Sequence, residues 1–148
     1  MELILWRHAD AAEGTPDLLR ELTAKGSKQA AKVAVFLHQH LPDHLRILVS
    51  PATRTQQTAS ALTHHFTLAP TLAPGASAEA VLHAARWPDD GGAVLVVGHQ
   101  PTLGEVAAQL LCCADAALNI KKGAVWWFSQ REGSAQVSLR LVITPDLL

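Results

Sequence analysis

Polar side chains capable of chemistry stand directly after three short apolar runs of this sequence. They are Arg7 and His8 after the first run, Ser50 after the second, with Arg54 one turn into the helix that follows, and His99 after the third. Ligands bind outside the carboxyl ends of the strands in open α/β sheets, so we expect these side chains to meet at one edge of a sheet. The two imidazoles and two guanidiniums would form a cluster of hydrogen-bond donors and positive charge, with no matching carboxylates at the strand ends.

Such a cluster suits a tetrahedral group with two negative charges. Arginine offers a fixed fork of donors to phosphate oxygens, and a helix starting at Ser50 and Pro51 would add free backbone N–H groups. A histidine such as His8 can attack phosphorus when one of its ring nitrogens is unprotonated. We expect nearby cations to lower the pKa of His8, and a backbone carbonyl to hold the proton on its other nitrogen.

Hydrophobic patterning predicts the elements that must position these side chains. Short apolar runs predict buried strands, and a spacing of three to four residues predicts helices. We expect strands over residues 3–6, 47–49, 67–72, 93–97, 124–128 and 136–143. We expect helices over residues 27–41, from 50 to 65 or 66, 77–87 and 102–113, with a loop over residues 9–26. This order predicts an α/β fold of three layers, with a mostly parallel central sheet and helices on both faces, in a single domain over residues 1–148.

Local patterns add three finer expectations. Ser50 has the position of a helix N-cap before a proline. Thr102 and Glu105 have the spacing of a capping box. Apolar residues at every second position from Val137 to Ile143 predict one buried face for the last strand.

The composition favours a compact globular protein and gives no sign of several partner classes. Apolar residues make up 49% of the chain, charged residues 17%, and the net charge is −1 with histidine neutral. This balance predicts neither a nucleic-acid nor a membrane partner. The N-terminal apolar run is too short for a signal peptide, and no stretch approaches the ~18 apolar residues of a membrane span, so we expect a cytoplasmic protein.

Neither the cysteines nor the remaining histidines predict a metal site. Cys112 and Cys113 are adjacent, whereas disulfide frameworks and zinc sites need spaced pairs. His38 and His40 are two residues apart on an expected helix and do not share a face. We therefore expect no metal and no cofactor.

The motifs at the strand ends resemble those of the histidine phosphatase superfamily. Arg7-His8-Ala9 is similar to the Arg-His-Gly signature of that family, and Gly98-His99 is similar to its second histidine. Residues 50–58, Ser-Pro-Ala-Thr-Arg-Thr-Gln-Gln-Thr, are similar to the family pattern Ser-Pro-x-x-Arg-[Ala/Thr]-x-Gln-Thr. The stretch Asp17-x-x-Arg20-x-Leu22-Thr23-x-x-Gly26 resembles the SixA-like phosphohistidine phosphatases in particular.

The resemblance implies a phosphoglycerate mutase-like fold and a metal-independent phosphatase. His8 would be the nucleophile that takes the phosphoryl group from the substrate. The residues expected to hold the phosphoryl oxygens or to contact the substrate are Arg7, Arg54, His99, Arg20 and Ser50.

One feature of the family is missing from this sequence. Many members carry a glutamate proton donor after the third strand, but residues 71–75 contain no carboxylate, and Glu79 is expected to face solvent on a helix. Asp17 is the leading substitute because the SixA-like pattern has an aspartate there, and Asp10, two residues after His8, is the second. A third alternative is that the reaction needs little acid help, since an imidazole leaves phosphorus more readily than an alkoxide does.

We therefore expect a phosphatase that works through phospho-His8, with a phosphohistidine-bearing protein as the favoured substrate. The missing glutamate favours a P–N bond, and the short chain leaves little length for a lid, which suits a phosphate displayed on a protein. Two alternatives stay open. One is a phosphomonoesterase of small metabolites with the same chemistry, and the other is a phosphate-binding interaction module without turnover.

Overall fold

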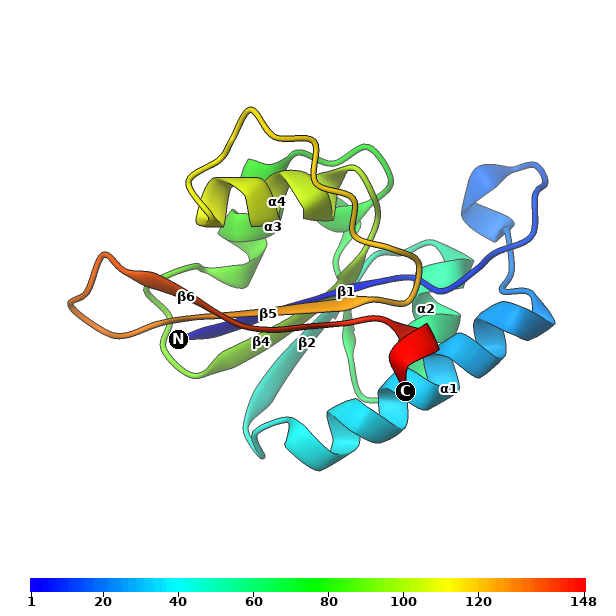
Figure 1. Ribbon diagram of the computed structural model, residues 1–148. Coiled ribbons are helices and arrows are strands. Elements are labelled where there is room, and N and C mark those ends of the chain that lie inside the picture. Colours follow the sequence, from blue (N-terminus) through cyan, green and yellow to red (C-terminus); the bar gives the residue numbers. More distant parts are fainter.

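Six strands form one continuous sheet that carries helices on both faces (Figure 1). The computed structural model describes residues 1–148. The strands are β1 (Glu2–Arg7), β2 (Leu45–Val49), β3 (Thr67–Leu68), β4 (Ala93–Gly98), β5 (Val125–Gln130) and β6 (Val137–Ile143). The helices are α1 (Ala24–His40), α2 (Thr53–Ser60), α3 (Ala78–Ala85) and α4 (Thr102–Leu110), with short 3-10 turns η1 (Asp17–Leu19), η2 (Pro70–Leu72) and η3 (Pro145–Leu147).

The strand order of the sheet is β3-β2-β4-β1-β5-β6. The pairs β2–β3, β2–β4 and β1–β4 are parallel, whereas β5 joins β1, and β6 joins β5, in antiparallel pairs. The sheet is therefore mostly parallel, and the predicted α/β fold class with helices on both faces is confirmed.

The central strands are continuous apolar runs because both of their faces are covered. In β1, Leu3 and Leu5 point into one core while Ile4 and Trp6 point into the other, and all four side chains are fully buried. Every residue of β4 is buried in the same way. These two strands form the buried middle of the sheet.

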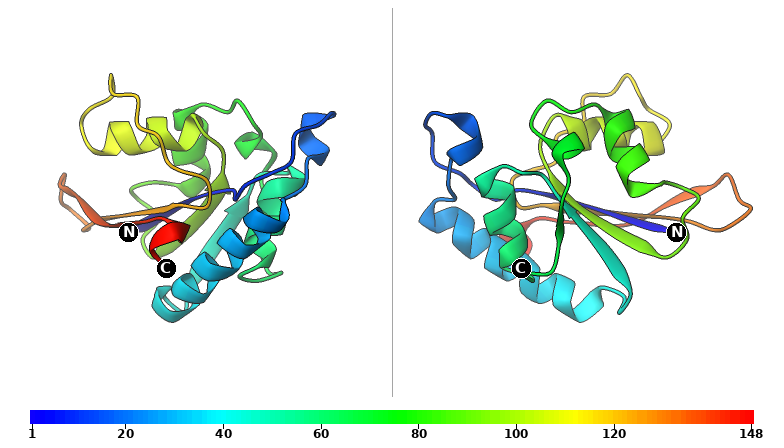
Figure 2. Two further views of the ribbon diagram at one scale, coloured as in Figure 1. Left: turned by 45° about the vertical axis from the view of Figure 1, so that its right-hand side comes forward. Right: turned by 180° about the vertical axis from the view of Figure 1, so that it is seen from behind.

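The helices divide between the two faces of the sheet, as the rotated views show (Figure 2). Val81 of α3 and Val106 of α4 belong to the core on one face. Val33 of α1 and Ala59 of α2 belong to the core on the other. No helix in the chain combines the length and the apolar character needed to cross a membrane.

The predicted loop over residues 9–26 contains more structure than expected. It includes η1 and the first turn of α1, which begins at Ala24 rather than at residue 27. Thr23 is the N-cap of α1, since its hydroxyl accepts the backbone N–H of Gly26 at 3.0 Å. The segment that holds η1 projects past the carboxyl end of β1 (Figure 1).

The helix predicted from Ser50 is shorter than expected. α2 begins at Thr53, with Ala52 as its N-cap, and ends at Ser60. The prediction that Ser50 caps this helix is wrong because the helix begins three residues later. The Ser50 hydroxyl accepts the backbone N–H of Ala52 at 3.3 Å, but its shorter bond, at 2.7 Å, is to a tertiary partner, the ring of His99.

The capping box predicted at Thr102 and Glu105 is also wrong. The N-cap of α4 is Pro101, which makes no side-chain cap. The hydroxyl of Thr102 instead donates to the carbonyl of Ala76 at 2.6 Å and ties α4 to the segment before α3. α4 also ends at Leu110 rather than at residue 113.

The buried face predicted for β6 is only half-buried and changes sides along the strand. The pairing of β5 with β6 shifts register between Trp127 and Phe128. Val137 consequently packs against the core below α3 and α4, while Leu141 and Ile143 pack against the opposite core. A β-bulge moves side chains to the other face, which simple alternation cannot anticipate.

Candidate active site

The carboxyl ends of β1, β4 and β2 lie next to one another at one edge of the sheet. Because β4 pairs with both other strands, the backbone N–H of His8 donates to Gly98 O, and that of Ser50 donates to Val97 O, each at 3.1 Å. His8, Ser50 and His99 therefore emerge side by side. The ring centroids of the two histidines are 5.3 Å apart.

His8 is held as a neutral imidazole with a defined tautomer. Its Nδ1 lies 2.7 Å from the carbonyl of Ala9. A carbonyl only accepts, so Nδ1 carries the proton and Nε2 keeps a free electron pair. Burial, together with the positive charges of Arg54 and Arg7, lowers the pKa of His8 to about 4. The expected effect of the cations is present, and burial is the larger cause.

Arg7 is fixed by the loop that precedes β5. Its Nη1 donates to the carbonyl of Ile120 at 2.8 Å. Its Nε is buried and donates to no group of the protein. This N–H of the guanidinium is therefore unsatisfied within the protein.

Arg54 lies in the first turn of α2 and is almost completely buried, with 4% of its surface exposed. Its Nη1 donates to the backbone carbonyl of Asp17 at 2.8 Å, and its Nη2 lies 3.1 Å from the Asp17 carboxylate. Its Nε, like that of Arg7, is buried without a partner. This side chain connects α2 to the η1 segment.

The ring of His99 is oriented by two neighbours. Arg54 Nη2, which can only donate, lies 3.4 Å from Nδ1 of the ring. Nδ1 is then the acceptor, and Nε2 donates to the Ser50 hydroxyl at 2.7 Å. Burial, with smaller effects of His8 and Arg54, lowers the pKa of His99 to about 3. Both histidines are neutral at pH 7.

Asp17 and Arg20 form an ion pair above Arg54. Arg20 Nη1 lies 3.1 Å from one carboxylate oxygen of Asp17, and Arg54 Nη2 lies 3.1 Å from the other. The hydrogen bonds from Arg20 and Arg54 hold the pKa of Asp17 below its usual range. Asp17 is therefore ionised at neutral pH in this arrangement, although its side chain is half-exposed.

The carboxylate of Asp10, the second candidate acid, is bonded to Lys122 and Thr23 rather than to Arg54. Its carboxylate lies 2.8 Å from Lys122 Nζ and accepts the hydroxyl of Thr23 at 2.8 Å. The bonds from Lys122 and Thr23 hold the pKa of Asp10 below its usual range. Glu79 is exposed on α3, as predicted, and accepts a hydrogen bond from Gln109.

The predicted site residues meet at this one edge. Hydrogen bonds or ring contacts link six of them, which are His8, Asp17, Arg20, Ser50, Arg54 and His99. Arg7 precedes His8 at the end of β1 and is bonded to Ile120. The chain contains no group of three or more histidine, cysteine, aspartate or glutamate side chains arranged to hold a metal ion.

Two supporting contacts were not predicted from the sequence. Thr58 accepts the backbone N–H of Ala9 at 3.1 Å and donates to the carbonyl of Arg54 at 2.7 Å, so one hydroxyl joins the two halves of the site. Its place at the end of the motif over residues 50–58 was the available signal. The bond from Arg7 to Ile120 joins residues far apart in the chain, and no motif indicates it.

A protein-family model matches the first half of the chain. The model describes the histidine phosphatase superfamily (branch 1), and the match covers residues 3–77. This stretch contains three of the four motifs at the site, and His99 lies beyond it.

Individual relatives agree with the family match. An uncharacterised protein of Picosynechococcus sp. is 37% identical, over 93% of this chain and 88% of its own length. A phosphohistidine phosphatase SixA homolog of Haemophilus influenzae is 33% identical, over 74% of this chain and 77% of its own. A protein histidine phosphatase SixA, solved with tungstate, superposes with a TM-score of 0.83 at 24% identity over 99% of both chains.

Proposed function

This chain belongs to the histidine phosphatase superfamily, and we propose that it hydrolyses protein phosphohistidine through a phosphoryl group carried on His8. Membership makes the protein a phosphatase with a catalytic histidine and a phosphorylated substrate. It favours an enzyme over a phosphate-binding module without turnover. The roles of individual residues and the phosphohistidine substrate are the proposal.

The observation that carries the proposal is a neutral histidine near two arginines, each of which has a buried N–H group without an acceptor in the protein. His8 Nε2 has a free electron pair because Nδ1 is bonded to Ala9 O. The Nε groups of Arg7 and Arg54 are buried and donate to nothing in the protein. A phosphoryl oxygen is an acceptor that would satisfy such donors, and buried unsatisfied donors are otherwise costly.

In the first step, Nε2 of His8 attacks phosphorus in line with the bond to the substrate imidazole. A P–Nε2 bond forms as the substrate P–N bond breaks, and charge on the phosphoryl oxygens is held by Arg7 and Arg54, while His99 accepts from Arg54 through Nδ1 and keeps that guanidinium oriented. When the second ring nitrogen of the substrate carries a proton, the imidazole leaves neutral. His8 becomes a phosphorylated imidazolium whose Nδ1–H stays on Ala9 O, so no proton has to be transferred.

In the second step, water attacks the phosphorus of phospho-His8. The P–Nε2 bond breaks, and the electron pair returns to His8, which is neutral again with its proton on Nδ1. Both protons of the water leave with the product as dihydrogen phosphate. The arginines that stabilise the first transition state serve the second, because the phosphoryl group stays at the same place.

The balance of protons supports phosphohistidine rather than a phosphate ester. An alkoxide would need a proton donor, and both candidate carboxyls are ionised at neutral pH in the ligand-free protein, because Arg20 and Arg54 hold the pKa of Asp17, and Lys122 that of Asp10, below the usual range. One of them would first have to take up a proton before it could serve an ester. A neutral imidazole needs no such donor. The 33% identity to a phosphohistidine phosphatase SixA homolog points to the same substrate class.

The test is phosphate release from a synthetic phosphohistidine peptide in the presence of EDTA. The wild type should release phosphate with multiple turnovers, and His8→Asn should lose about 10³-fold in kcat/KM. p-Nitrophenyl phosphate serves as the ester control. Turnover of the ester without turnover of the peptide would reject phosphohistidine as the substrate and support the small-metabolite phosphomonoesterase.

A further inference from the structure

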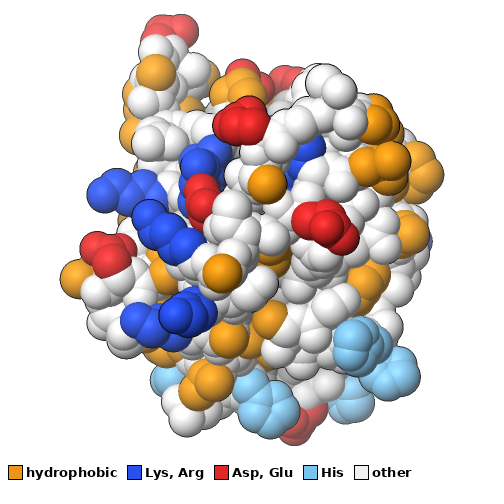
Figure 3. Space-filling view, turned by 90° about the vertical axis from the view of Figure 1, so that its right-hand side faces the viewer, with side chains coloured by type: hydrophobic (Ala, Val, Ile, Leu, Met, Phe, Trp, Pro, Cys, Tyr) orange, Lys and Arg blue, Asp and Glu red, His pale blue; other side chains and the backbone are white.

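All five lysines of the chain lie on one surface. They are Lys25, Lys28, Lys32, Lys121 and Lys122. The net charge of the whole chain is only −1, so this segregation is a local feature that composition conceals. Basic side chains gather along one side of the face seen from the right of Figure 1 (Figure 3). These five residues are called the lysine surface below.

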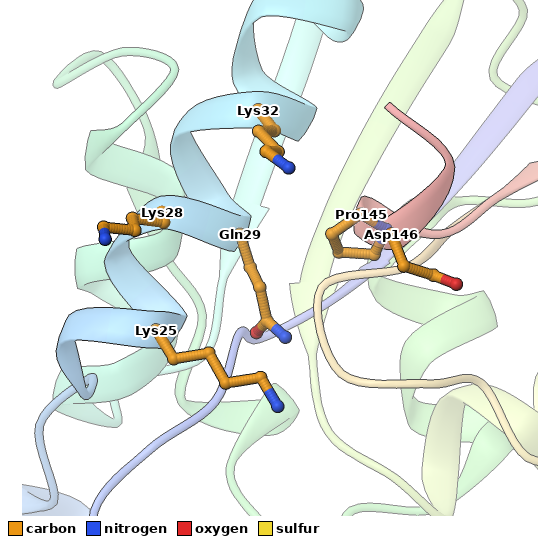
Figure 4. Close-up of a pocket in the computed structure, with 6 residues that line it drawn as sticks. All are labelled: Lys25, Lys28, Gln29, Lys32, Pro145 and Asp146. Atoms are coloured by element: carbon orange, nitrogen blue, oxygen red, sulfur yellow. The ribbon is translucent and has the colours of Figure 1, made fainter.

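The lysine surface surrounds two adjoining cavities between α1 and the C-terminal turn η3. Their volumes are about 430 and 420 Å³, and Lys25, Gln29, Pro145 and Asp146 line both. Lys25, Gln29 and Lys32 extend from α1 towards Pro145 and Asp146 (Figure 4). The result is an open, basic groove rather than a closed pocket.

The groove reaches the candidate active site. Arg7 lines the second cavity together with Lys25 and both lysines of the loop before β5. This loop is bonded directly to the site, since Arg7 Nη1 donates to Ile120 O at 2.8 Å and the backbone N–H of Gly123 donates to His8 O at 3.1 Å. A molecule lying in the groove would therefore end beside the nucleophile.

Most of this positive charge is unpaired. All five lysines are exposed, and the ion pairs of the protein include only Lys122, with Asp10. Asp146 is the one carboxylate residue that lines the groove. Four ammonium groups thus have no partner within ion-pair distance, which leaves a basic field next to the site.

We propose that the lysine surface binds an acidic segment of the phosphohistidine-bearing protein and so holds the phosphohistidine against His8. The proposal rests on the function proposed above and names the chemistry of its protein substrate. Lys25 and Lys32 are seven residues apart on α1, which is about 10 Å along a helix. Exposed ammonium groups spread over that length match a row of carboxylates better than one compact phosphate, which buried arginines bind more tightly.

The test compares two synthetic phosphohistidine peptides that differ only in one flanking segment, rich in glutamate in the first and in glutamine in the second. At low ionic strength the wild type should favour the acidic peptide by about 10-fold in kcat/KM, mainly through KM. Lys25→Glu with Lys32→Glu should abolish the preference, and about 1 M salt should do the same. Phosphoimidazole, which carries no flanking segment, should be hydrolysed equally by both proteins.

Two controls separate charge from structure. Lys25→Arg with Lys32→Arg keeps the charge and should keep the preference, and Arg131→Glu reverses an exposed charge on the distant turn between β5 and β6 and should also keep it. Equal kcat/KM of the wild type on the two peptides would overturn the docking proposal alone. Release of phosphate from p-nitrophenyl phosphate but from neither peptide would overturn the proposed function, and the docking proposal with it.

Discussion

At the residue scale, the hydroxyl of Ser50 decides which nitrogen of His99 faces Arg54. The hydroxyl is fully buried and bonds Nε2 of His99 at 2.7 Å, which leaves Nδ1 towards Arg54. Ser50 also accepts the backbone N–H of Ala52. We therefore propose that Ser50 acts through His99, whose Nδ1 accepts from Arg54, as a positioning residue rather than as the direct phosphate contact expected from the sequence.

Ser50→Ala should lower kcat on the phosphohistidine peptide by about 10- to 100-fold, with a smaller change in KM. The ring of His99 would lose the bond that fixes its orientation, while the arginines that bind the ground state would stay in place. Steady-state kinetics, with a thermal melt to check folding, measures this. An unchanged kcat in a folded variant would contradict the positioning role.

We propose Asp17 rather than Asp10 as the proton donor for an ester, because the carboxylate of Asp17 lies on Arg54 whereas that of Asp10 is paired with Lys122. A bound phosphoryl dianion would repel the carboxylate and raise the pKa of Asp17. Asp17→Asn should then cost about 10²-fold in kcat on an alkyl phosphate ester, and less than about 5-fold on the phosphohistidine peptide, whose leaving group needs no acid. Asp10→Asn is the matched control, with equal effects on both substrates. Equal losses for Asp17→Asn on both substrates would contradict the acid role.

At the element scale, the start of α1 packs tightly against the segment that follows β1 and His8. A β-carbon at Gly26 would overlap the carbonyl oxygen of Asp10. That same oxygen accepts the backbone N–H of Thr23 at 3.0 Å. Only a glycine at position 26 allows the helix to approach Asp10, which lies two residues after His8. This gives a structural reason for the place of Gly26 in the motif.

Gly26→Ala should lower the free energy of unfolding by about 2 kcal/mol, because the helix and the segment after β1 must move apart. Urea unfolding at pH 7 measures the change. Ser27→Ala, at the exposed neighbouring position of the same helix, should change the free energy by less than about 0.5 kcal/mol. Equal effects of the two substitutions would contradict the close approach.

The strands were predictable because their signal is local, whereas the partners of two predicted helix-cap hydroxyls were not. β1 and β4 are buried on both faces, so burial alone produces the apolar runs that predict them. The hydroxyls of Ser50 and Thr102 have the positions of caps but bond groups that the fold brings from far along the chain. A local sequence pattern cannot show that a distant group competes with the helix for the same hydroxyl.

At the scale of the whole molecule, the site and the stability of the fold are coupled through two buried histidines. The pKa values of His8 and His99 are about 4 and about 3, against about 6.5 in an unfolded chain. Below pH 6.5 the unfolded state therefore binds protons that the folded state does not. The contribution of the two neutral histidines to the free energy of unfolding is complete above pH 6.5, and it is lost as the pH is lowered towards their folded pKa values.

Urea unfolding between pH 6.5 and 4.5 should reveal this coupling. His8→Asn should reduce the slope of the free energy of unfolding against pH by up to about 1.4 kcal/mol per pH unit, the contribution of one proton. His65→Asn, a substitution of an exposed histidine, is the control and should leave the slope near that of the wild type. A His8→Asn slope equal to that of the wild type would contradict a neutral, buried His8.

The sequence predicts that the site residues come together in the folded molecule, but it does not predict the lysine surface. Strand-end residues meet because parallel strands place their carboxyl ends at one edge, and the sequence reports those ends. Lys25 and Lys121 belong to elements almost a hundred residues apart and come together only through the packing of α1, the loop before β5 and η3. The net charge of the chain gives no sign of such a surface, because acidic residues elsewhere cancel its charge.

The most direct test of the account is to trap the phosphoryl group on the protein. Wild type is mixed with excess phosphohistidine peptide in EDTA, quenched within milliseconds in alkali, where a phosphoramidate survives, and digested for mass spectrometry. The account predicts one phosphoryl group on the peptide that contains His8, and none in His8→Asn. Rapid turnover by the wild type with no phosphoryl group on His8 would contradict it.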